Sequence, residues 1–190
     1  MRLFLHYPTL ETRQENLSSS PFSYTQVGAT QNTLPSTLSR IYNIDRYEAV
    51  VGQGQACFQA AKQALQGWIH FDLGWVNIQA PPPTIGLVVP VVVQVLGLWT
   101  LNYCKVIYLL DEPRKWGFAY GTLDEHGEMG EERFLIYHCP ENNDVRYEIL
   151  AFSKPKHWLA KLGYPLSRKL QRKFAVESLA RVQQFIQTNE

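Results

Sequence analysis

The fold is decided by residues 116–152, WGFAYGTLDEHGEMGEERFLIYHCPENNDVRYEILAF. Three runs rich in aromatic and β-branched residues alternate there with two polar runs, Asp124–Gly127 and Glu141–Asp144, which are typical of tight turns. Strands joined by such short turns pair with their neighbours in opposite directions. The stretch therefore predicts an antiparallel meander with strands over 116–123, 131–138 and 145–152.

The segment before this meander, 85–110, is apolar enough to require a membrane check. A spanning helix needs about 20 nearly uninterrupted apolar residues. Pro90, Gln94, Asn102 and Lys105 interrupt the segment, and β-branched residues dominate its first half. This pattern predicts two strands joined near Gly97, not a transmembrane span.

Two amphipathic helices flank the predicted strands. Over residues 55–68, apolar side chains recur every three or four positions, as on one face of a helix. A longer helix at the C-terminal end is indicated by Leu166, Leu170, Phe174, Val182, Phe185 and Ile186. Because strands and helices do not alternate as βαβ units, we expect an α+β helix-grip fold. In that fold a curved antiparallel sheet wraps around the long C-terminal helix and leaves a cavity between them.

The length of 190 residues is close to the usual size of one domain, so we expect a single domain over residues 1–190. Residues 9–20 are polar and are predicted to be a mobile lead. Short strands are expected over 22–27 and 47–51. Gly52 and Gly54 lack the context of a dinucleotide-binding loop and are interpreted as a hinge between a strand and the first helix.

Charge and cysteine content limit the function classes. The net charge of +1 gives no reason to expect nucleic acid. Three widely spaced cysteines and the lack of a signal-peptide core predict reduced thiols and a cytoplasmic location. Residues 154–181 carry eight basic side chains and one acidic one, whereas 111–132 carry seven acidic side chains. These segments are either solvated faces that neutralise each other or, for 154–181, a surface for an anionic head group or membrane.

Several motifs resemble those of an uncharacterised family, the "domain of unknown function nineteen-ninety" group of bacteria and plants. They are Gly117–Leu123 (GFAYGTL), His126, Gly130–Phe134 (GEERF), Phe152–Pro155 (FSKP) and Leu162–Pro165 (LGYP). The resemblance covers about residues 22–187. It implies a distant START/Bet v 1-like fold, in agreement with the helix-grip prediction, and brings no established activity with it.

Strand alternation sorts the candidate site residues onto sheet faces. Trp116, Phe118, Tyr120 and Thr122 share one face, opposite Gly117, Ala119 and Gly121, whose small side chains indicate a close neighbour. Glu132 and Glu148 each share a face with apolar residues, where a carboxylate must be paired, protonated or functional. For Glu148 the alternative is an ion pair with Arg133 or Arg146. The predicted ligand-binding set is Trp116, Phe118, Tyr120, Thr122, Glu132, Phe134, Glu148 and Arg172.

The acid–base candidates are Tyr120, His126 and Glu132. The sequence contains no GxSxG, HExxH or CxxC motif, so it predicts no metal and no cofactor. His126, in a probable turn among acidic residues, is better explained by turn packing than by metal binding. The leading hypothesis is a binding module for a hydrophobic or amphipathic small molecule. The alternatives are a cyclase- or hydratase-like enzyme using the same cavity, and a membrane-surface or protein-interaction module.

Overall fold

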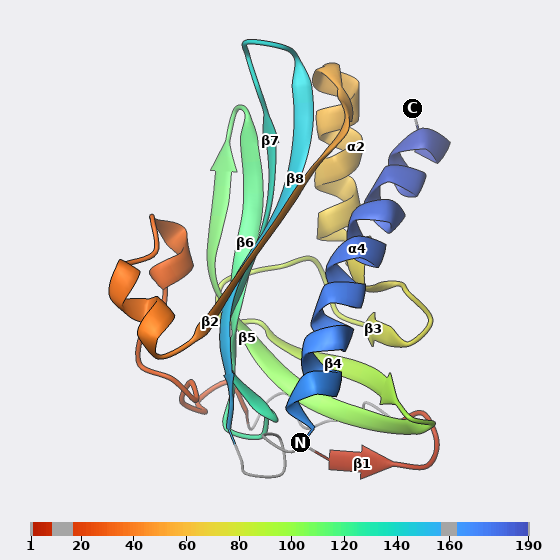
Figure 1. Cartoon of the computed structure of the whole chain (residues 1–190). Coiled ribbons are helices and arrows are strands. Elements are labelled where there is room, and N and C mark those ends of the chain that lie inside the picture. Colours follow the sequence, from red (N-terminus) through yellow and green to blue (C-terminus); the bar gives the residue numbers. More distant parts are fainter. Residues whose placement is uncertain (1, 9–16, 157–162, 190) are drawn as a thin grey trace.

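The structure, a computed structural model, describes residues 2–8, 17–156 and 163–189 (Figure 1). Its eight-stranded sheet has the order β2-β8-β7-β6-β5-β4-β3, with β1 paired to β5. The strands are β1 (Arg2–Phe4), β2 (Asn43–Gln53), β3 (Val76–Ile78), β4 (Val88–Val95), β5 (Leu98–Glu112), β6 (Lys115–Thr122), β7 (Glu128–His138) and β8 (Asp144–Pro155). The helices are α2 (Gly54–Gln66) and α4 (Tyr164–Asn189), with the 3-10 turns η1 (Ala29–Gln31), η2 (Ser36–Arg40) and η3 (Ile69–Phe71).

The strand pairing confirms the predicted antiparallel sheet. The meander of residues 116–152 forms β6, β7 and β8, and the apolar segment 85–110 contains β4 and most of β5. The sheet curls, and both α2 and α4 lie against one of its faces (Figure 1). This arrangement is the predicted helix-grip fold.

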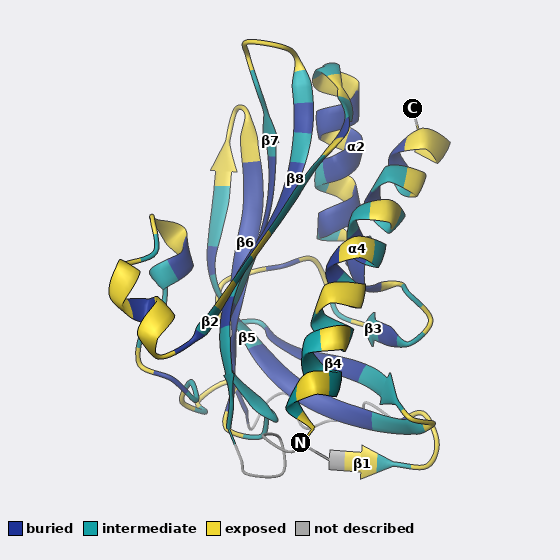
Figure 2. Cartoon of the chain, in the orientation of Figure 1, coloured by how far each residue is buried: buried dark blue, intermediate teal, exposed yellow. Residues whose placement is uncertain are grey.

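The main core fills the space between the helices and the inner, helix-covered face of the sheet. Phe118, Phe134 and Tyr147 point into it from three adjacent strands and are fully buried. Helix α2 contributes small side chains that allow close approach, including Ala61 and Ala64. Helix α4 turns a narrow buried stripe inward and an exposed side outward (Figure 2).

The outer face of the sheet is covered as well, by the chain between Leu17 and Tyr42. The predicted strand over 22–27 is wrong: the described structure has only one bridge there, between Phe22 and Leu123. The predicted close neighbour of the small-residue face is Tyr24, since a Cβ on Gly121 would lie 2.2 Å from its hydroxyl oxygen. Of the lead predicted to be mobile, residues 9–16 lie outside the described residues, and Leu17 is buried.

Gly52 and Gly54, the two glycines of the predicted hinge, lie at the junction between β2 and α2. Gly54 begins the helix with a φ of 83°, in the left-handed region that glycine tolerates, and its N–H donates to the Asn143 carbonyl at 2.9 Å. Strand β2 extends well beyond the predicted 47–51. Among the described residues, no helix has the length and apolarity needed to cross a membrane. Cys57, Cys104 and Cys139 form no disulfide with one another.

Candidate functional site

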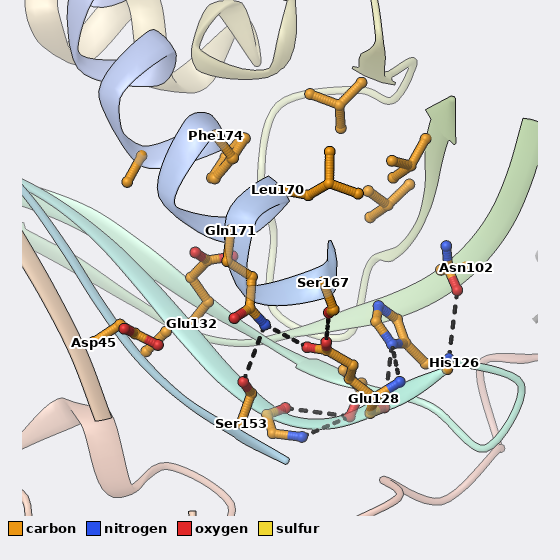
Figure 3. Close-up of a pocket in the computed structure, with 18 of the residues that line it drawn as sticks. Asp45, Asn102, His126, Glu128, Glu132, Ser153, Ser167, Leu170, Gln171 and Phe174 are labelled. Atoms are coloured by element: carbon orange, nitrogen blue, oxygen red, sulfur yellow. Dashed lines mark hydrogen bonds between the residues drawn. The ribbon is translucent and has the colours of Figure 1, made fainter. Parts of the chain in front are cut away.

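A pocket of about 420 Å³ lies between the inner face of the sheet and the first half of α4 (Figure 3). Side chains from β2, from every strand between β3 and β8, from η3 and from α4 line it. Its apolar wall consists of Phe71, Trp75, Val76, Val91, Val93, Val95, Ile149, Leu166, Leu170, Phe174 and Ala175. The wall is therefore largely hydrophobic, and its polar groups lie at a few separate points.

Glu132 and Tyr120 form a hydrogen-bonded polar pair on the pocket wall. They face each other across the β6–β7 pair, and the Tyr120 hydroxyl donates to the Glu132 carboxylate at 2.8 Å. Burial raises the pKa of Glu132 to about 7, with Asp45 and Glu128 adding like charge. The same burial, with the neighbouring carboxylate, raises the pKa of Tyr120 well above its usual value. A carboxyl that titrates near neutral pH can hold or release a proton inside the pocket.

Glu128, on the same strand as Glu132, connects the sheet to α4 (Figure 3). Its carboxylate accepts hydrogen bonds from the Ser167 hydroxyl and from the Gln171 amide, the latter at 2.6 Å. The Gln171 amide also lies 3.3 Å from the Ser153 hydroxyl on β8. These contacts hold the first turns of the helix over the pocket.

His126 lies in the β6–β7 turn and contributes to the pocket wall. The backbone N–H of Glu128 lies 3.0 Å from its Nδ1, and the Glu128 carbonyl oxygen lies 3.1 Å from the same nitrogen. Burial lowers the pKa of His126 to about 4. At neutral pH the imidazole is uncharged, and its tight turn contact agrees with the turn-packing interpretation.

Asp45 enters the pocket wall from β2 and is paired by helix α4. The Arg168 guanidinium binds its carboxylate with two nitrogens, at 2.5 and 2.6 Å. Both side chains are mostly buried, with 18% of Arg168 and 16% of Asp45 exposed. This two-pronged ion pair is a second connection between the sheet and the start of α4.

The structure brings together four of the predicted site residues, Tyr120, Thr122, His126 and Glu132, on one pocket wall. The Thr122 hydroxyl is already engaged, 2.6 Å from the Ser23 hydroxyl and accepting from the Gly130 N–H. Of the other predicted residues, Trp116, Phe118 and Phe134 face the same way but are buried in the main core instead of lining the pocket.

Two further predicted ligand contacts lie elsewhere. Glu148 points to the outer face, where Arg133 and Arg46 bind its carboxylate at 2.5 and 2.6 Å. This geometry matches the ion-pair alternative with Arg133, so Glu148 is not a pocket residue. Arg172 lies on α4 with an exposed side chain and does not line the pocket either. Both faces of the sheet are covered by apolar residues, so the apolar neighbours of Glu148 along its strand do not indicate which face holds the pocket.

Sequence reasoning missed Asp45, Glu128, Ser167 and Gln171. A signal for the last two was present, because Ser167, Leu170, Gln171 and Phe174 recur at helical spacing and share one face of α4. Polar side chains within an otherwise apolar stripe indicate a polar partner across the interface. Within the described residues, no three His, Cys, Asp or Glu side chains gather to hold a metal ion.

The basic segment 154–181 is partly neutralised within the chain. Four of its eight cations carry ion pairs: Lys156 with Asp124, Arg168 with Asp45, Lys173 with Glu177 and Arg181 with Asp72. Lys156 joins this segment directly to the acidic one. Lys161 lies outside the described residues.

Comparison with known structures shows a shared fold at low sequence identity. The crystal structure of Ara h 8.0201 matches with a TM-score of 0.53 and 10% identity, covering 78% of this chain and 99% of that one. Norcoclaurine synthase from Thalictrum flavum, in complex with dopamine and hydroxybenzaldehyde, matches with a TM-score of 0.53 and 9% identity, covering 79% and 89%. These matches confirm the Bet v 1-like helix-grip architecture.

Sequence relatives are closer. A UPF0548 protein of Dictyostelium discoideum is 37% identical over 162 residues, covering 78% of this chain and 75% of the relative. A UPF0548 protein of Arabidopsis thaliana is 36% identical over 143 residues, covering 71% and 69%. The model of the family described as "Domain of unknown function (DUF1990)" matches residues 23–181, which confirms the resemblance of the sequence motifs. The chain belongs to this family.

Proposed function

We propose that this protein binds a hydrophobic or amphipathic small molecule in the pocket between the sheet and α4. The observation that carries the proposal is the pocket itself, about 420 Å³ of space with an apolar wall and a few convergent polar groups. Ligand sites in proteins have volumes of roughly 300–1,000 Å³ and this mixture of lining groups. The complex of norcoclaurine synthase with two small aromatic molecules supports the idea by analogy of fold. We also propose a cytoplasmic location, because the three cysteines form no disulfide with one another and disulfides are rare in the cytosol.

Filling the pocket tests the proposal. Leu170 lines the pocket, and Leu170→Trp places a large indole in its space. Val176 is 62% exposed on the same helix, so Val176→Trp is a matched control. We expect the neutral fluorescent probe N-phenyl-1-naphthylamine to bind at least tenfold more weakly to the Leu170→Trp variant, and equally to the control. Native mass spectrometry of the freshly purified protein should show a copurified ligand that the Leu170→Trp variant loses. Equal probe binding by wild type and the Leu170→Trp variant would refute the proposal.

One observation favours a second candidate, an acid–base enzyme of the cyclase or hydratase kind. Glu132 faces the pocket with a pKa of about 7 and is hydrogen-bonded to Tyr120, an arrangement suited to proton transfer. The two candidates differ in how they respond to Glu132→Gln. An enzyme would lose turnover of a substrate found in a carbonyl and enol library while still binding it. A protein that only binds would show no turnover with wild type at any pH between about 5 and 9, a range centred on the carboxyl pKa.

A further inference from the structure

The charged groups of the pocket all have the same sign. Asp45, Glu128 and Glu132 line it, Glu131 borders it with a carboxylate that points to the outer face of the sheet, and among the described lining residues there is no Lys or Arg. His126 is the one basic side chain among these described lining residues, and it is neutral at physiological pH because burial lowers its pKa to about 4. The pocket therefore presents a negative potential to whatever enters it.

Three of these four carboxylates already have strong partners. Arg168 binds Asp45, while Ser167 and Gln171 donate to Glu128. The carboxylate of Glu131 is bound on the outer side of the sheet by Tyr24, Gly28 and Thr30. These groups have little capacity left for a ligand.

Glu132 differs from the other three. Its one hydrogen bond in the described structure comes from Tyr120, and no ion pair of the described residues includes it. The side chain is only partly buried and lines the pocket from β7 (Figure 3). A carboxylate has room for about four hydrogen bonds, so Glu132 can accept further donors from a molecule in the pocket.

We infer that the pocket selects an apolar molecule carrying a protonated amine, and that Glu132 is the counter-ion of that amine. The inference rests on the proposed binding function and specifies its ligand class. An ammonium group would supply the donors that Glu132 lacks, in a charge-assisted hydrogen bond. A carboxylate or phosphate head group would instead be repelled by Glu128 and Glu132, since Arg168 neutralises Asp45.

The electrostatics of the groups around Glu132 support this assignment. Burial, together with the charges of Asp45 on β2 and Glu128 on β7, raises the pKa of Glu132. Burial likewise raises the pKa of Cys104 and Tyr147 in the adjoining core, and the charge of Glu132 adds to both shifts. A bound ammonium would reverse this balance and keep Glu132 ionised. Amine binding at pH 6 should therefore release close to one proton, because the free carboxyl titrates at about 7.

Three ligands with one chain and different head groups test the inference: decylamine, decanol and decanoate, titrated calorimetrically at pH 8 below their micellar concentrations. We expect decylamine to bind at least tenfold more tightly than decanol, the factor typical of one charge-assisted hydrogen bond, and decanoate to bind most weakly. In the Glu132→Gln variant the amine should lose its advantage over decanol. Glu112→Gln, which removes an exposed carboxylate of β5 paired with Lys115, should leave all three affinities unchanged.

The outcomes separate the inference from the function on which it rests. If decanol binds but decylamine shows no advantage, or if the advantage persists in the Glu132→Gln variant, the amine inference is wrong and the binding function stands. If decanoate binds as tightly as decylamine, the same conclusion follows. If none of the three binds, the binding function and the inference both fail. Proton release at pH 6, measured in buffers of different ionisation enthalpy, should be present in wild type and absent in the Glu132→Gln variant.

Discussion

Glu131 and Glu132 are neighbours on β7, yet they belong to two different regions of the molecule. Glu131 points to the outer face, is 2% exposed, and accepts hydrogen bonds from the Tyr24 hydroxyl, the Gly28 and Thr30 N–H groups and the Thr30 hydroxyl. Glu132 points to the inner face and has one such partner. The same residue type is thus a structural anchor where donors surround it and a candidate ligand contact where they do not. The following variants probe this difference, the largest expected effect first.

The largest effect is expected from Glu131→Gln. The amide keeps the size of the side chain but replaces one acceptor oxygen with a donor that faces other donors. Buried donors left without acceptors cost about 1–3 kcal/mol each, so we expect a loss of about 2–4 kcal/mol in the free energy of unfolding. Urea denaturation at pH 7 measures the loss. A change below about 0.5 kcal/mol would mean that the segment 17–42 is not anchored by this carboxylate.

Glu132→Gln should have the opposite sign. The folded-state pKa of about 7 lies above the ordinary 4.5, so the folded protein binds this proton more tightly than the unfolded chain. The protonated carboxyl stabilises the fold at low pH, and that contribution is lost as pH rises from about 4.5 through 7. We therefore expect the variant to match wild type at pH 4 and to be more stable by about 1–3 kcal/mol at pH 8.

Urea denaturation of both proteins across this pH range measures the effect. A stability difference between them that does not vary with pH would show that Glu132 has an ordinary pKa in the folded protein.

These two residues also show how far the sequence could predict the site. Alternation along a strand places Glu131 and Glu132 on opposite faces with certainty, because the side-chain period of a strand is two. It does not say which face holds the pocket. Here both faces are apolar, since the chain between Leu17 and Tyr42 covers the outer one. For this reason the candidate residue Glu132 lines the pocket, whereas the candidate residue Glu148, on a face with an equally apolar pattern, is paired with Arg133 on the outer side.

The covering segment itself was the least predictable part of the fold. Its pattern at 22–27 is that of a strand, but there the described structure has one backbone hydrogen bond to the sheet, from the Ser23 N–H to the Thr122 carbonyl. The N–H groups of Gly28 and Thr30 donate instead to the Glu131 carboxylate. A side chain more than 100 positions away thus takes the place of a neighbouring strand. Local patterns carry no information on such a contact. The meander and α4, whose patterns are long and periodic, were predicted well for the converse reason.

Gly121→Ala would sharpen the comparison by disturbing the outer layer alone. The new methyl group would lie 2.2 Å from the Tyr24 hydroxyl and 3.0 Å from the Phe22 ring. Tyr24 is hydrogen-bonded to Glu131 and cannot move away freely. Overpacking of this kind costs about 1–3 kcal/mol, which thermal or urea unfolding would measure. In a Tyr24→Phe background the cost should fall, because the nearest atom is absent. Equal costs in both backgrounds would contradict the proposed contact.

The smallest effect is expected where α4 meets the pocket. Arg168→Gln removes the ion pair with Asp45, whose partners are mostly buried, and should cost about 1 kcal/mol of global stability. The local consequence should be clearer, because Arg168, Ser167 and Gln171 are the polar contacts that hold the start of this helix over the pocket. Amide hydrogen exchange should accelerate over residues 163–172 and stay unchanged over 176–186. Arg181→Gln, which removes the more exposed pair with Asp72 on the same helix, is the matched control and should leave residues 163–172 protected. Exchange that accelerates equally along all of α4 would show that the helix opens as one unit. The pocket could then not be uncovered by its first turns alone, and its polar contacts would serve the stability of the whole helix.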